Sequence, residues 1–272
     1  MSLQHKPMKK HIGRNRHNKY THTHFNHLHR PRRSVVEISF EGKYMTLAYY
    51  NDKFDLHIGD LVYVDGKLEG LLGRVVSVNY NFKIKLSDYK RVIALVDTTV
   101  KGQFFTAGPQ FITFDREAIP RKQVLSWFKP PFEEDDDFVS GNDDSTFSLD
   151  NLISTKFTSN VFSRGCEYHD DNRVKYISLD GSRGYAIVEG SKPYEVEFQY
   201  KNGEISHLVC SCYCSYNCKH EVAVLLNLRE ILKLIETHYS DEYENSGYFA
   251  AINKATLMYF AIGAKEKVSF TL

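Results

Sequence analysis

Hydrophobic and polar positions alternate in short runs over residues 34–99. The run SVVEISF (34–40) alternates, and KYMTLAYY (43–50) is rich in residues that favour strands. Glycines punctuate the short Val, Leu and Tyr runs that follow, at Gly59, Gly66, Gly70 and Gly73. Because glycine permits the tight turns between strongly bent strands, this pattern predicts a small β-barrel or a curled sheet.

Two segments follow this region, first a strand and a short helix and then an acidic stretch. QFITF (110–114) has the pattern of a strand, and REAIPRKQVLSWF (116–128) that of a short helix ending before two prolines. Residues 133–150 then hold eight Asp or Glu and no Lys or Arg. Such a run repels itself and buries little, so it predicts a solvated acidic linker after a β-rich domain at 34–132.

Residues 151–272 combine strand patterns with helix patterns. Four strands are expected, in RVKYISL (173–179), RGYAIVEG (183–190), YEVEFQYK (194–201) and ISHLVCSC (205–212). Residues 219–239 carry an apolar stripe at helical period, and 247–263 are expected to form a second helix. The predicted fold class is therefore α+β: a small N-terminal β-barrel-like domain, an acidic linker, and an antiparallel sheet with helices.

The net charge of +1 conceals a basic arm at residues 1–33, which holds nine Lys or Arg and no acid. We expect this His-rich arm to be disordered. In an alternative interpretation, its cations contact nucleic-acid phosphates. The candidates for such contacts, with one cation from the C-terminal half, are Lys9, Lys10, Arg14, Arg16, Arg30, Arg32, Arg33 and Lys219.

No apolar run is long enough to span a membrane, and no apolar segment follows the basic arm as in a secretory signal. The chain is expected to be cytoplasmic. Its richness in Asn, Lys, Tyr, Phe and Ile suits an AT-rich, bacterial or phage genome.

Four of the five cysteines lie between Cys210 and Cys218, and His220 follows. In a reducing compartment, clustered cysteines favour metal binding over disulfides. Zinc takes four sulfur or nitrogen ligands, so one of the five candidates is surplus. A first pair at Cys210 and Cys212 leaves five residues before Cys218, whereas a pair at Cys212 and Cys214 leaves only three.

The longer loop reverses the chain more easily. The predicted ligands of one structural Zn²⁺ are therefore Cys210, Cys212, Cys218 and His220, with Cys214 as a thiol of the loop. Three thiolates and a dication sum to −1, a charge that Lys219 would offset. Cys166, far from this motif, is expected to be a free thiol.

The order Cys-x-Cys, loop, Cys-x-His, apolar helix resembles the SWIM zinc finger. The preceding residues 164–200, with a V-x-G-S-x-x-Y-x-V pattern from Val188 to Val196, resemble the strand region that these domains carry before their first ligand pair. SWIM domains occur ahead of bacterial Swi2/Snf2-type helicases, in transposases and in recombination-associated proteins. The resemblance covers roughly residues 155–235 and implies a module that binds nucleic acid or protein.

A second resemblance concerns the N-terminal half. GDLVYV (59–64), GLLGRVVSV (70–78) and KRVIALVD (90–97) resemble small SH3-like barrels and the DNA-end-binding N-terminal domain of primosomal helicases. Any small barrel needs glycines at its sharp turns, so a purely structural barrel is an equal alternative.

The sequence contains no phosphate-binding Walker loop, dinucleotide fingerprint, H-E-x-x-H or G-x-S-x-G motif. Four protein ligands would also leave a zinc ion no open position for catalysis. We therefore expect a non-catalytic zinc protein that binds nucleic acid, DNA rather than RNA, or joins a helicase-type or other partner in a nucleic-acid-processing machine. The alternative is a protein-interaction adaptor that does not touch nucleic acid.

Overall fold

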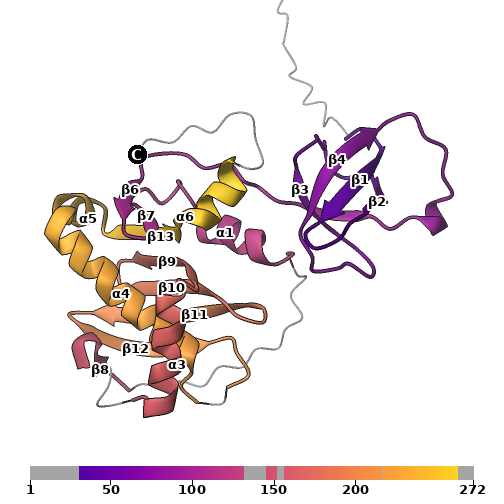
Figure 1. The fold of residues 1–272 in the computed structure, drawn as a ribbon. Coiled ribbons are helices and arrows are strands. Elements are labelled where there is room, and N and C mark those ends of the chain that lie inside the picture. Colours follow the sequence, from indigo (N-terminus) through magenta and orange to yellow (C-terminus); the bar gives the residue numbers. More distant parts are fainter. Residues whose placement is uncertain (1–30, 132–144, 152–155, 215, 263–272) are drawn as a thin grey trace, which may run out of the picture. The chain divides into compact units, whose positions relative to one another are not determined.

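The computed structural model describes residues 31–131, 145–151, 156–214 and 216–262, and these form two antiparallel sheets (Figure 1). The first sheet has five strands in the spatial order β2-β1-β4-β3-β5. Their bounds are β1 Ser34–Phe40, β2 Thr46–Asn51, β3 Leu61–Val64, β4 Gly73–Asn79 and β5 Val92–Leu95. β4 begins with glycine at position 73, where any larger residue would clash: a Cβ atom added to Gly73 would lie 2.4 Å from Ile38 Cγ2.

The predicted β-barrel is wrong, because this sheet is open. Its two edge strands, β2 and β5, meet at a single isolated bridge between Tyr50 and Arg91, where Tyr50 N donates to Lys90 O at 2.8 Å. Closing a barrel requires a continuous ladder between the edge strands with a matching stagger. The glycine pattern predicted the strands and turns correctly but carried no information about that ladder.

The second sheet has eight strands, in the spatial order β6-β7-β13-β9-β10-β11-β12-β8. Their bounds are β6 Phe105–Ala107, β7 Gln110–Thr113, β8 Phe147–Ser148, β9 Val174–Asp180, β10 Arg183–Glu189, β11 Pro193–Lys201, β12 Glu204–Cys210 and β13 Tyr248–Asn253. β7 pairs with β13 and β8 pairs with β12. This sheet therefore takes strands from residues 34–132 and 133–150, so the fold is not a barrel followed by a separate zinc domain.

Helices cover both faces of the eight-stranded sheet. In β10, Ala186 and Val188 belong to one hydrophobic core, whereas Tyr185 and Ile187 belong to the other. The first core includes residues of α4, and the second includes residues of α1 and α6. The helices are α1 Arg121–Phe128, α3 Ser159–Asp170, α4 Lys219–His238, α5 Ser240–Ser246 and α6 Lys254–Leu257. Short turns add 3₁₀ segments at Leu86–Asp88 and Leu149–Asn151 and a π-helical turn at Met258–Ile262.

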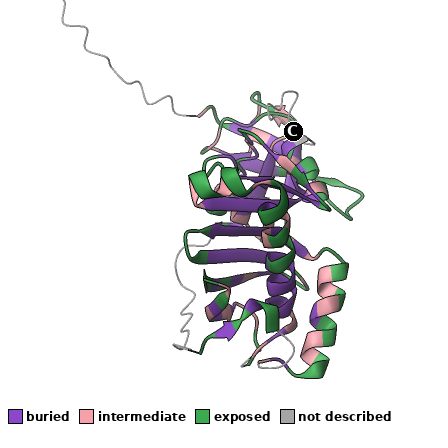
Figure 2. Ribbon diagram, turned by 90° about the vertical axis from the view of Figure 1, so that its left-hand side faces the viewer, coloured by how far each residue is buried: buried purple, intermediate pink, exposed green. Residues whose placement is uncertain are grey.

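Burial follows this layered arrangement. The central strands are buried along most of their length, and the outer helices present exposed residues to solvent (Figure 2). None of the helices in the described ranges is long and apolar enough to cross a membrane.

Two segments differ from the sequence-based expectation. Tyr248–Asn253, expected to be helical, is strand β13, and all six of its residues are buried. A continuous apolar run suits a central strand with helices over both faces. Asn253 then ends the strand, because its side chain accepts a hydrogen bond from Thr256 N at 3.2 Å and caps α6. Residues 164–170, expected to belong to the strand region of a SWIM domain, are helical. They form the second half of α3, whose N-cap is Thr158.

Candidate metal centre

The candidate metal centre lies where β12 ends and α4 begins. Cys210 is the last residue of β12, and Cys218 is the N-cap of α4, so His220 falls in the first turn of that helix. The backbone N–H of Cys218 donates to the Glu221 carboxylate at 2.9 Å, which forms half of a capping box. The end of β12 and the start of α4 therefore determine the positions of three of the four predicted ligands.

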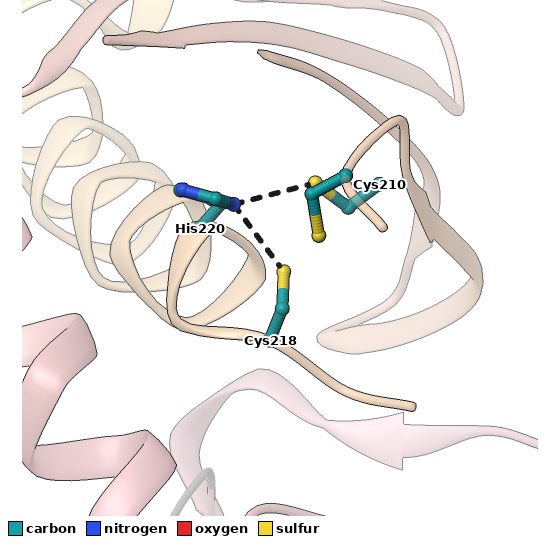
Figure 3. A group of neighbouring side chains, drawn as sticks. Cys210, Cys218 and His220 are labelled. Atoms are coloured by element: carbon teal, nitrogen blue, oxygen red, sulfur yellow. Dashed lines mark hydrogen bonds between the residues drawn. The ribbon is translucent and has the colours of Figure 1, made fainter. Parts of the chain in front are cut away.

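The structure brings together all four side chains proposed from the sequence. One ligand atom from each of Cys210, Cys212, Cys218 and His220 lies within 4.8 Å of the other three. His220 Nδ1 lies 3.7 Å from the sulfur of Cys210 and 3.7 Å from that of Cys218 (Figure 3). Cys210, Cys218 and His220 are buried, and Cys212 is half-buried.

These distances fit a tetrahedral metal. With zinc–sulfur bonds of about 2.3 Å and a zinc–nitrogen bond of about 2.0 Å, the edges of a tetrahedron measure about 3.5 Å for S···N and about 3.8 Å for S···S. The two observed S···N separations, 3.7 Å each, lie within a few tenths of an ångström of the expected S···N edge. The four residues can hold one metal ion with little rearrangement.

The thiols of the metal-free cluster divide into two kinds. A hydrogen bond from Cys210 lowers the pKa of the Cys218 thiol to about 4, and the backbone N–H of Glu221 and the ring of His220 act in the same direction. The same hydrogen bond and burial raise the pKa of Cys210, and burial raises that of Cys212 to about 12. The cluster thus presents one thiolate at the positive end of a 20-residue helix, a favourable place for an anionic metal site.

Aromatic residues enclose the His220 ring. Tyr194 of β11 stacks on it, with ring centroids 4.3 Å apart and an interplanar angle of 23°. Tyr168 of α3 meets it edge-on at 5.4 Å. A side chain at Gly190 would come within 2.7 Å of the Tyr194 ring, and Ser191 Oγ lies 2.8 Å from Tyr194 Oη. The Gly, Ser and Tyr of the quoted V-x-G-S-x-x-Y-x-V pattern therefore support the ligand histidine.

The remaining thiols are placed differently. Cys214 is exposed and does not belong to the cluster of four. Cys166 is half-buried on α3, where it packs against the first hydrophobic core.

The predicted phosphate-binding residues are only partly described. Lys9, Lys10, Arg14, Arg16 and Arg30 lie outside the described residues. Arg32 and Arg33 are exposed just before β1, and the Arg32 guanidinium lies 4.2 Å from the centre of the Tyr80 ring. Lys219 stands beside the metal cluster, and its ammonium lies 4.2 Å from the centre of the Tyr168 ring.

Sequence reasoning missed the aromatic residues around the cluster. Tyr213 and Tyr216 lie between the ligand pairs and are strongly exposed, and the ammonium of Lys192 lies 4.9 Å from the Tyr213 ring centre. The sequence signal was present in CYCSYNC (212–218), where tyrosines alternate with cysteines and small polar residues in a loop too short to bury them.

Comparisons with known proteins add one relative. No family model matches the chain, and no solved structure matches it. An uncharacterized protein from Methanocaldococcus jannaschii is 28% identical to it over 99 residues. That stretch covers 34% of this chain and 42% of the relative, so the chain spans less than half of the relative's length. The function must therefore be argued from the site.

Proposed function

We propose that the chain is a non-catalytic zinc protein whose SWIM-type finger serves as a structural recognition module on nucleic acid or within a nucleic-acid-processing machine. The observation that carries the proposal is the set of three cysteines and one histidine whose ligand atoms lie within 4.8 Å of one another. Soft thiolates with one imidazole favour Zn²⁺ over the oxygen-seeking divalent ions. Four protein ligands leave no position for substrate, which favours a structural role.

The zinc ion would link the end of β12 to the first turn of α4. Eleven residues of α4 are buried, so the helix is an integral part of the first hydrophobic core. A metal that joins strand to helix converts its binding free energy into folding free energy.

Nucleic-acid binding rests on the cations. Lys219 begins α4 beside the cluster, and Arg32 and Arg33 are exposed ahead of β1. Lysine and arginine on such surfaces contact phosphates and release condensed counterions. The density of cations in the basic arm, together with these residues, supports the proposal that the chain pairs with the phosphates of DNA.

Two measurements test the proposal. Metal analysis of the purified protein is expected to give one zinc per chain. Anisotropy of labelled oligonucleotides, single-stranded and duplex, is expected to show binding at about 50 mM salt that weakens steeply by about 200 mM. Absence of zinc would overturn the metal assignment, and absence of binding to any oligonucleotide would overturn the nucleic-acid assignment.

A groove along α4 favours the adaptor as a second candidate. It measures about 1050 Å³, and its lining includes Leu226, Leu232 and Ile235 of α4 beside Tyr243 of α5. Charged residues of α4, among them Arg229 and Glu230, border these apolar side chains. An adaptor would bind a partner protein here, and Leu232→Arg is expected to release that partner while leaving the zinc content unchanged.

A further inference from the structure

The loop between the two ligand pairs carries two tyrosines that the metal site does not use. Tyr213 is 90% exposed and Tyr216 is 88% exposed, whereas Tyr194 beside His220 is 8% exposed. Exposed rings gain no free energy from burial, so packing does not explain why two aromatic residues occupy this short loop. Their faces are available for stacking against another molecule.

One cation contacts a ring of this loop, and a second, Lys219, lies where α4 begins after the loop. The ammonium of Lys192, in the turn between β10 and β11, lies 4.9 Å from the ring centre of Tyr213 and 5.9 Å from that of Tyr194. Among the described residues, neither Lys192 nor Lys219 has a carboxylate within 4.0 Å of its ammonium. Both charges are therefore available to phosphates.

The loop is also held at both ends. Cys212 precedes Tyr213, and Cys218 follows Tyr216 by two residues, so both ends of the loop are anchored by predicted ligands. A loop fixed in this way loses less conformational entropy on binding than a free one.

We infer that this loop binds single-stranded nucleic acid, with bases stacked on Tyr213 and Tyr216 and phosphates contacted by Lys192 and Lys219. The inference rests on the proposed function and names its substrate class. Unpaired bases expose the faces on which aromatic side chains stack, whereas bases in a duplex are already stacked on one another. Non-specific single-strand sites combine exposed aromatic rings for the bases with nearby cations for the phosphates.

The test compares oligonucleotides that differ only in their bases. Fluorescence anisotropy at about 50 mM salt would use labelled oligothymidine, oligouridine and an abasic deoxyribose-phosphate strand, each about 20 nucleotides long. The variants are Tyr213→Ala/Tyr216→Ala, the stacking-competent control Tyr213→Phe/Tyr216→Phe, and Tyr44→Ala. Tyr44 is a matched control because it is fully exposed, at 110%, between β1 and β2.

We expect the wild type to bind oligothymidine or oligouridine more tightly than the abasic strand. The double alanine variant should lose about 5- to 150-fold in affinity for each stacked base and should bind the abasic strand as the wild type does. The phenylalanine pair and Tyr44→Ala should bind normally, with unchanged zinc content in all variants. The preferred strand assigns the site to DNA or to RNA.

The possible failures are distinguishable. If the wild type binds neither these strands nor a duplex, the proposed nucleic-acid function fails, and the inference fails with it; if it binds a duplex alone, only the inference fails. If the wild type binds the abasic strand as tightly as the base-bearing strands, or the alanine pair changes nothing, the stacking site is refuted while phosphate binding stands. If the alanine pair instead releases a copurifying protein without changing oligonucleotide affinity, the loop belongs to a protein interface.

Discussion

Single-cysteine variants separate the predicted ligands from the spare thiol. Cys212→Ala removes a sulfur that lies within 4.8 Å of three other ligand atoms, whereas Cys214→Ala removes an exposed thiol two residues further along the same loop. The second variant is therefore a matched control for the first. We expect Cys212→Ala to lose zinc at equilibrium with a weak chelator and Cys214→Ala to keep one ion per chain.

The expected loss of zinc-binding free energy follows from the number of ligands. Structural zinc sites of this kind bind with about 10–16 kcal/mol near pH 7, which corresponds to about 2.5–4 kcal/mol for each of four ligands. Loss of one ligand then weakens zinc binding by roughly 10²- to 10³-fold. The same free energy is lost from folding, because the metal binds the folded chain. For a chain of this size that lowers Tm by about 5–16 °C.

X-ray absorption spectroscopy at the zinc edge identifies the ligand atoms and their distances from the metal. The wild type and Cys214→Ala should both show three sulfurs at about 2.3 Å and one nitrogen at about 2.0 Å. Three sulfurs in Cys212→Ala would mean that Cys214 takes the vacant position, which would refute the assignment of Cys212 as the required ligand. Loss of metal from Cys214→Ala would refute it equally.

Two further outcomes concern protons and packing. Because Cys210 and Cys212 have raised pKa values and keep their protons at pH 7 in the metal-free protein, zinc binding should release about two protons from them. The affinity for zinc should then fall about 100-fold for each pH unit by which the solution is acidified. Calorimetry in buffers of different ionisation enthalpy measures the number of protons released. Gly165→Ala should cost about 1–3 kcal/mol in urea unfolding, because the added Cβ would lie 2.3 Å from Val222 Cβ, where α3 crosses α4.

Each of these outcomes has its own control. Zinc binding that releases no proton would contradict the protonation pattern of the thiols. Ser163→Ala, at an exposed position of α3, should leave unfolding unchanged; an equal loss in both variants would show that α3 as a whole, rather than the contact at Gly165, is sensitive.

The metal centre was accessible to sequence reasoning because its ligands are local. All four predicted ligands fall between Cys210 and His220, so loop length alone could rank Cys212 above Cys214. The residues that support the site are not local. Tyr168 and Tyr194 reach His220 from α3 and β11, and neither position is signalled by the spacing of the ligands.

The sheets show where local pattern stops being informative. Alternation predicted β1, and strand-favouring runs bounded by turn residues predicted the four strands β9 to β12, because each of them has at least one strongly buried face. The five-residue apolar run Tyr248–Ile252 fits a buried strand or a buried helix equally well, and only its pairing with β7 and β9 decides. The pairing with β7 spans more than a hundred residues and the pairing with β9 more than sixty, both beyond the range of any periodicity.

Chelation should affect the two faces of the eight-stranded sheet unequally. All four predicted ligands lie on or beside the first core, whereas the single tryptophan, Trp127, lies in the second core, stacked on Phe260 at 4.7 Å. Removing the metal frees the loop and the first turn of α4 but takes no contact from the second core. We therefore expect chelation to abolish the base-dependent part of oligonucleotide binding at concentrations that leave the Trp127 emission unchanged. A red shift of that emission in step with the loss of binding would instead show that the metal holds the whole fold together.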